Sequence, residues 1–139
     1  MTLHPDQLRD LARRYTDAWC SRDPAKVAAH YAPEGSLTVN GGKPAQGREA
    51  IIETARSFMT AFPDLHVLMD DLVLRDRGAE YHWTLIGTNT GTGGTGNSVR
   101  ISGFEEWTIG DDGLIVESQG HYDQSEYDRQ LQHGVDEPR

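Results

Sequence analysis

Cysteine is nearly absent from this chain of 139 residues, and long apolar stretches are missing altogether. Cys20 has no second cysteine to pair with, so an internal disulfide is excluded and a reducing, cytoplasmic location is expected. No apolar run approaches the roughly 18–20 residues that span a bilayer. The stretch from Met1 to Asp6 lacks the basic and apolar parts of a signal peptide. We therefore expect neither membrane insertion nor export.

Positive charge is also scarce. Lys and Arg together number 13 against 22 Asp and Glu, which gives a formal net charge of −9. The phosphates of nucleic acids and anionic lipid headgroups repel such a chain, so neither nucleic acid nor a membrane surface is an expected partner. The length is typical of one domain, and we expect residues 1–139 to form a single domain.

The common catalytic and metal-binding signatures are lacking as well. The six histidines form no His-x-x-x-His pair, and there is neither a Cys-x-x-Cys nor a Gly-x-Ser-x-Gly. A zinc site and a serine nucleophile elbow are therefore not expected. The glycine-rich run 91–97 lies between two strand patterns and opens no helix, which favours a hairpin tip over a phosphate-binding loop.

Hydrophobic periodicity divides the chain into a mainly helical first part and a stranded second part. Apolar residues at steps of three and four, with Pro, Gly and Asp at the boundaries, predict helices at about 6–22, 24–32 and 47–61. Alternation predicts strands at about 36–40, 65–75, 79–90, 98–109 and 114–122, before a polar helix at 124–133. This order indicates an α+β fold, in which a curved sheet closes over the helices and leaves a conical cavity.

The last predicted strand carries the strongest candidates for chemistry. Alternation places His121 and Asp123 on one face at the strand end, where they can tune each other as an acid–base pair. The alternative is an exposed histidine beside an aspartate that caps the final helix. A third interpretation is that His121 and Asp123 bind a metal ion. A bulge would exchange the two faces of the strand, so the sequence leaves the inward face open.

Aromatic residues and one glutamate form the second group of candidates. Four large aromatic side chains belong either to the core or to a pocket wall: Tyr15, Trp19, Trp83 and Trp107. Glu105 shares a strand face with Trp107, and a glutamate that points inward is costly unless it is paired or functional. Glu106 takes that place if the register is shifted by one residue.

Several short motifs follow one another between about residues 8 and 133. They are Tyr15…Trp19, Tyr31-Ala32-Pro33-Glu34, Gly47-Arg48-Glu49-Ala50-Ile51, Phe62-Pro63-Asp64-Leu65, Gly87-Thr88-Asn89-Thr90-Gly91 and Asp112-Gly113-Leu114-Ile115-Val116-Glu117. In this order and spacing the chain resembles the SnoaL-like polyketide cyclases, which belong to the nuclear transport factor two-like superfamily.

The resemblance implies a cone-shaped α+β fold around a hydrophobic pocket, with neither metal nor organic cofactor, and we expect a homodimer. It implies that Asp123 takes a proton from a carbon next to a carbonyl, with the enolate oxygen stabilised by a donor such as His121, Asn40 or Tyr15. The residues expected to bind substrate are Tyr15, Trp19, Asn40, Phe58, Trp83, Glu105, Trp107 and Gln119.

The chain departs from the family pattern at Asn89, where histidine is common, and at Gln119, where tryptophan is common. Two classes of function stay open. The first is a cofactor-independent cyclase, isomerase or hydratase that acts on a small carbonyl compound. The second is a non-catalytic module that binds a small apolar ligand or dimerises. A hydrolase that activates water is a further enzymatic alternative, and it requires Glu105, Asp123 and Asn40 all to point inward.

Overall fold

Four helices and six strands follow one another in the computed structural model, which describes residues 4–135. The helices are α1 (Pro5–Cys20), α2 (Pro24–Ala28), α3 (Arg48–Ala61) and α4 (Gln124–His133). The strands are β1 (Tyr31–Val39), β2 (Ala45–Gln46), β3 (His66–Arg75), β4 (Gly78–Thr88), β5 (Ser98–Ile109) and β6 (Ile115–Tyr122). Within residues 4–135, no helix is both long enough and apolar enough to cross a membrane. The expectation that the chain has no signal peptide rests on residues 1–6, and of these residues 1–3 lie outside the described part.

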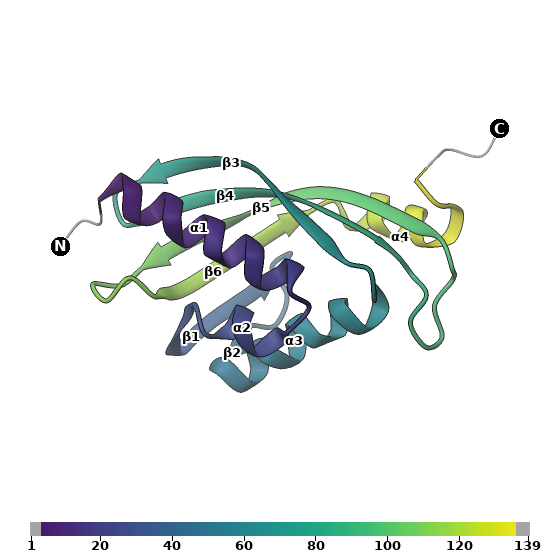
Figure 1. The fold of residues 1–139 in the computed structure, drawn as a ribbon, viewed down its shortest axis with the longest axis horizontal. Helices are drawn as coiled ribbons and strands as arrows, with labels where there is room; N and C mark the ends of the chain where they lie inside the picture. The colour runs from purple at the N-terminus through teal and green to yellow at the C-terminus, as the bar shows by residue number, and fades with distance from the viewer. Residues whose placement is uncertain (1–3, 136–139) are drawn as a thin grey trace.

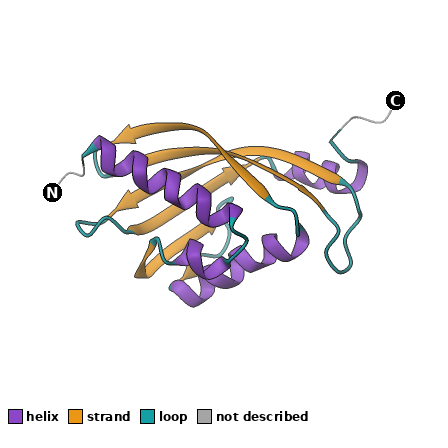
Figure 2. Ribbon diagram, viewed as in Figure 1, coloured by secondary structure: helices purple, strands orange, loops and turns teal. Residues whose placement is uncertain are grey.

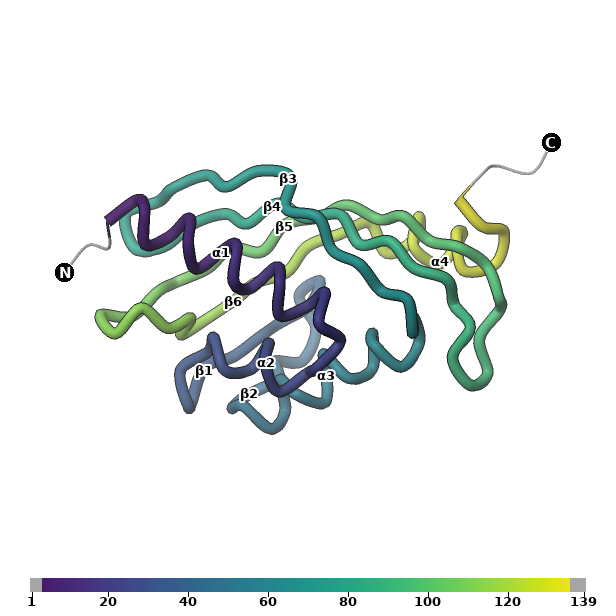
Figure 3. Tube along the Cα trace, viewed as in Figure 1, coloured from purple at the N-terminus to yellow at the C-terminus, as the bar shows by residue number. Residues whose placement is uncertain are grey.

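All six strands belong to one mixed sheet in the order β2-β1-β6-β5-β4-β3 (Figure 2). β1 runs parallel to β6, and the other neighbours are antiparallel. The register shifts between Met69 and Asp71 in β3, and the tube in Figure 3 bends along this strand. Such irregularities bend a strand and increase its twist, and here they let the sheet curve around the helices. The expected α+β fold with a curved sheet is confirmed.

The core lies between the helices α1, α2 and α3 and one face of the sheet (Figure 1). α1 buries the stripe that its periodicity predicts: Leu8, Leu11, Ala12, Tyr15, Ala18 and Trp19. α1 starts at a capping box, in which the His4 side chain accepts from the backbone of the first turn and the Gln7 side chain accepts from the His4 N–H. α4 lies apart from the other helices and contacts β5.

The structure differs from the predicted elements chiefly around β1. The helix expected to reach residue 32 ends at Ala28, and the extended chain already begins at Tyr31. Pairing of Tyr31 with Ile115 of β6 requires an extended chain here, and Pro33 disfavours a helical conformation of Ala32. β2 was not predicted, since two residues are too short to show a period. β2 pairs through Ala45 and Gln46 with β1.

Candidate functional site

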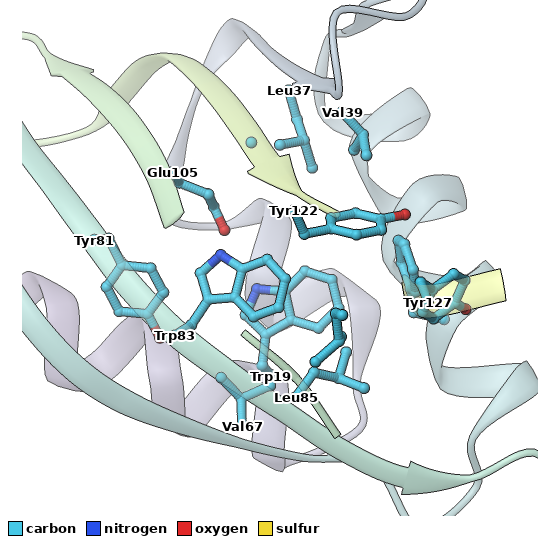
Figure 4. A pocket seen from close by; sticks show the side chains of 13 residues that line it. Trp19, Leu37, Val39, Val67, Tyr81, Trp83, Leu85, Glu105, Tyr122 and Tyr127 are labelled. Carbon is cyan, nitrogen blue, oxygen red and sulfur yellow. The ribbon is translucent and has the colours of Figure 1, made fainter. Parts of the chain in front are cut away.

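An apolar cavity lies between the inner face of the sheet and the helices, with a volume of about 640 Å³ including its open mouth. Figure 4 shows Glu105 at one end and the rings of Tyr122 and Tyr127 at the other. Among the described residues that line the cavity, Glu105 is the one carboxylic acid, and none is Lys or Arg. The structure therefore presents a single charged group to an otherwise hydrocarbon and aromatic wall.

Four of the predicted pocket residues line this cavity: Trp19, Phe58, Trp83 and Glu105. Tyr15 and Trp107 are buried in the layer behind Glu105 and contact it directly. Tyr122 on β6 and Tyr127 on α4 also line the cavity, although neither was predicted from the sequence to do so. Tyr122 shares the inward face of β6 with Ser118 and Gly120, which is the face opposite to the one that carries His121.

The choice between Glu105 and Glu106 is settled by the pairing of β5. Glu105 lies opposite Gly120 of β6 and is only 7 % exposed, whereas the neighbouring Glu106 points to the outer face. A Cβ atom at Gly120 would be 3.8 Å from Cγ of Glu105, an ordinary van der Waals distance, so the Glu105 side chain extends over this point of β6. The alternation of the strand then sends Trp107 inward beside Glu105.

Glu105 is held by hydrogen bonds that converge on one of its two oxygens. Oε1 accepts from the Ser118 hydroxyl at 2.7 Å, from the Trp107 indole at 3.0 Å and from the Tyr15 hydroxyl at 3.0 Å. The Tyr31 hydroxyl lies 3.4 Å from Oε1 and 2.9 Å from the Tyr15 hydroxyl, and its single proton serves one of these two contacts. Oε2 receives only the long contact of 3.3 Å from Tyr15. The protein thus saturates Oε1 and leaves Oε2 with capacity for a ligand.

Two tyrosines supply this network from below the cavity. The hydroxyl oxygens of Tyr15 and Tyr31 are 2.9 Å apart, and both side chains are fully buried. Burial, together with the negative charge of Glu105, raises the pKa of each tyrosine well above its ordinary value. Both therefore keep their protons at neutral pH and act as donors.

Burial also raises the pKa of Glu105 above the ordinary value of a glutamate. The hydrogen bonds from Ser118, Trp107, Tyr15 and Tyr31 favour the carboxylate and oppose this shift without cancelling it. A carboxyl group of this kind titrates closer to neutral pH than an exposed one. The raised pKa makes this carboxylate a stronger base than that of an exposed glutamate, which suits a general base that also returns the proton.

Asp123 lies at the surface, outside the cavity, which corrects its expected placement. Its carboxylate caps α4, accepting from the Glu126 backbone N–H at 3.1 Å and the Ser125 hydroxyl at 2.9 Å. These hydrogen bonds lower the pKa of Asp123. A general base in a pocket needs the opposite shift, so this geometry argues against Asp123 as the acid–base residue. Its role is to start the helix that carries Tyr127 to the cavity.

Replacement of Asp123 separates these two roles. Asparagine is as good a helix cap as aspartate, so Asp123→Asn is expected to retain the melting temperature and any activity of the cavity. Asp123→Ala removes the cap and is expected to lower the melting temperature by a few degrees. Thermal unfolding followed by circular dichroism measures both. If Asp123→Asn folds normally but loses turnover, Asp123 is the acid–base residue after all.

The other polar candidates also lie outside the cavity. His121 is on the outer face of the sheet, where its ring packs on Phe104 with centroids 4.8 Å apart and its Nε2 is 3.5 Å from a Glu106 carboxylate oxygen. Gln119 pairs with Glu106 on the same outer face. The predicted pair of His121 and Asp123 is therefore not assembled at the pocket. No group of three or more potential metal ligands occurs among residues 4–135.

Asn40 has a structural position at the end of β1. Its Oδ1 accepts from the Tyr122 N–H at 2.9 Å, and its Nδ2 donates to the Gln124 side chain at 3.3 Å. Asn40 thereby ties β1 to the junction of β6 and α4. Because neither Asn40 nor Asp123 points inward, the three-residue water site considered for a hydrolase is not formed.

Asn89, a position of departure from the family pattern, organises the glycine-rich loop. Its side chain accepts from the Thr95 N–H at 2.8 Å and donates to the Ala61 carbonyl at 3.1 Å. The loop thus joins β4 to β5 and is anchored to the end of α3. No helix starts in it, which agrees with a hairpin connection.

Both the sequence and the fold are similar to those of known proteins. The family model described as SnoaL-like polyketide cyclase matches residues 9–131. Among curated proteins no relative matches. A putative SnoaL-like polyketide cyclase from Jannaschia sp. CCS1 has a similar structure, with a TM-score of 0.81 and 16% identity over 95% of this chain and 97% of its own.

Two further solved structures are similar in fold. AclR, a putative hydroxylase from Streptomyces galilaeus, has a TM-score of 0.81 and 19% identity over 98% of this chain and 87% of its own. A hypothetical protein with a ketosteroid isomerase-like fold from Catenulispora acidiphila has a TM-score of 0.75 and 15% identity over 84% and 88%. At such identities these likenesses establish the fold and not the reaction. The match of the family model over most of its length shows that the chain belongs to the SnoaL-like polyketide cyclase family.

Proposed function

We propose that the protein is a cofactor-independent enzyme that moves a proton next to the carbonyl group of a small apolar compound. The observation that carries this proposal is the single carboxyl group of Glu105 in an apolar cavity, with Oε1 saturated and Oε2 left for a ligand. In this proposal Glu105 takes the role of general base that the family resemblance implied for Asp123. The reaction, removal of a proton from a carbon next to a carbonyl, is the expected one.

In the proposed step, the Glu105 carboxylate takes a proton from the carbon beside the carbonyl. The electron pair of the broken C–H bond moves toward the carbonyl and leaves an enolate, and Glu105 becomes a carboxylic acid. Where a double bond is conjugated with the enolate, return of the proton to the far carbon of that double bond completes an isomerisation. Where the enolate carbon instead attacks a second carbonyl, a new C–C bond closes a ring, and Glu105 returns its proton to the alkoxide that forms. The surrounding hydrocarbon excludes water and raises the basicity of the carboxylate.

The proposal is tested by exchange of the protons next to the carbonyl of indanone, followed by NMR in deuterium oxide. Because Glu105 must be ionised to act as base, the rate above the protein-free background is expected to rise with pH. Burial raises the pKa of Glu105. The midpoint should therefore lie above the ordinary pKa of a glutamate, with a plateau at higher pH. A protein that catalyses no exchange of indanone at any pH contradicts the proposal.

A second candidate is a non-catalytic module that binds a small apolar ligand. Two observations favour it: Asp123 is turned outward as a helix cap, and His121 lies on the outer face of the sheet. Such a module would bind indanone without accelerating the exchange of its protons. The expected homodimer, single domain and cytoplasmic location stay predictions.

A further inference from the structure

A buried hydrogen-bond donor without a partner faces the cavity. Nε1 of Trp83 is shielded from solvent and makes no hydrogen bond with any described residue. An indole N–H can only donate, and leaving it unpaired in a protein interior is costly. Buried polar groups of this kind are rare in native proteins and call for an explanation. An acceptor atom that arrives with a ligand is such an explanation.

The Trp83 ring is held firmly in this position. Trp83 pairs with Gly103 of β5, and a Cβ atom on Gly103 would come within 2.7 Å of the indole Cζ2. The absence of a side chain there lets the indole lie close to the strand. Tyr122 packs against the same indole edge to face, with ring centroids 6.0 Å apart. The N–H group is therefore pre-oriented, which lowers the entropy that binding costs.

Trp83 and Glu105 can reach the same small molecule. Their strands are adjacent, and Glu105 lies two positions from Gly103, the cross-strand partner of Trp83. Such diagonal neighbours are about 7–8 Å apart on one face of a sheet. Figure 4 shows the nitrogen-bearing side of the Trp83 ring and the Glu105 carboxyl group at the same end of the cavity.

The rest of the wall limits the chemistry of the occupant. Leu37, Val39 and Leu85 offer only hydrocarbon, and no cation is present among the lining residues to neutralise an acid. Glu105 adds a negative charge of its own when ionised. An anionic ligand would therefore be repelled, whereas a neutral compound with one acceptor oxygen matches both the donor and the apolar wall.

We propose that the Trp83 N–H binds the oxygen of a neutral monocarbonyl compound, a ketone or an aldehyde, and thereby selects it over hydrocarbons and carboxylic acids of the same shape. The inference rests on the proposed function for the carbonyl nature of the oxygen. In that reaction the same hydrogen bond strengthens as the oxygen gains charge in the enolate. Binding alone tests the inference, separately from turnover.

The direct test compares indanone with indane, which has the same ring system and no oxygen, and with indane carboxylate. Proton–nitrogen correlation spectra resolve the indole N–H signals, and the Trp83 signal is assigned by its loss in Trp83→Phe. Indanone is expected to move the Trp83 proton downfield, as a new hydrogen bond does. Indane should bind without a downfield shift, and indane carboxylate should not bind.

Affinities of variants complete the test. Trp83→Phe keeps an aromatic ring and removes the donor, so it should weaken indanone about fivefold to tenfold and leave indane within about twofold. Glu105→Gln should retain the Trp83 shift with indanone. Equal weakening of indanone and indane, or no response of the Trp83 signal to indanone up to its solubility limit, overturns the inference. If indanone moves the Trp83 signal downfield but the protein does not exchange the protons next to the indanone carbonyl, only the proposed function is refuted.

Discussion

Glu105→Gln is expected to lower the rate of proton exchange in indanone by about 10²–10⁴-fold. Glutamine has the shape of glutamate, and its amide oxygen can accept the same hydrogen bonds from Ser118 and Trp107. It cannot take up a proton, so the chemistry is lost while the cavity keeps its form. NMR in deuterium oxide, with protein and buffer blanks, measures the rate.

The matched control is Glu106→Gln, one residue further along β5. Glu106 lies on the outer face beside His121 and has no contact with the cavity. Its replacement removes the same charge from the chain and should leave the exchange rate unchanged. If Glu105→Gln exchanges protons within a few-fold of the unmodified protein, Glu105 is not the base and the proposed mechanism is wrong.

Trp107→Ala is expected to lower the free energy of unfolding by about 3–5 kcal/mol. Trp107 is 4% exposed, stacks on Tyr81 with centroids 4.8 Å apart and meets the edge of Tyr15 at 5.1 Å. Its indole also donates to Glu105. The alanine variant therefore loses buried area, two aromatic contacts and one donor to a buried carboxyl group.

Urea unfolding followed by far-ultraviolet circular dichroism measures this loss without depending on tryptophan fluorescence. Trp107→Phe keeps a ring in the stack and removes the N–H, so it should cost less than the alanine variant. Phe104→Ala is the control from the outer face of the same strand, where Phe104 packs on His82 and His121. A cost for Trp107→Ala no greater than that for Phe104→Ala would contradict the assignment of Trp107 to the core below the site.

The cavity and the network beneath it explain why one carboxyl group suffices for the proposed chemistry. Burial makes the Glu105 carboxylate more basic, and the donors on Oε1 keep that basic group oriented. The same donors limit the cost of burying the carboxylate when it is ionised. An exposed aspartate such as Asp123 has neither property, because water and the backbone of α4 already stabilise its charge.

Local pattern in the sequence was enough to predict much of the fold. The spacing of apolar residues in α1 identified the side that is buried, since a helix of 3.6 residues per turn shows its buried face in any short window. Alternation in β5 placed Glu105 and Trp107 on one face, and the structure has both on the inner face. The helical pattern placed the end of the second helix too late, because it does not show that Tyr31 pairs with Ile115 of β6.

The inward face of each strand, and with it the site, was decided only by the tertiary structure. Alternation groups residues by face, but the partner strand determines which face is covered, and one bulge reverses the order. In β6 the register shifts opposite Thr108 and Ile109, so Ile115 is buried although Gln119 and His121 point outward. Tyr31 lies 74 positions before Glu105 and Ser118 lies 13 positions after it, and strand pairing and helix packing bring the three together. No local pattern encodes that convergence.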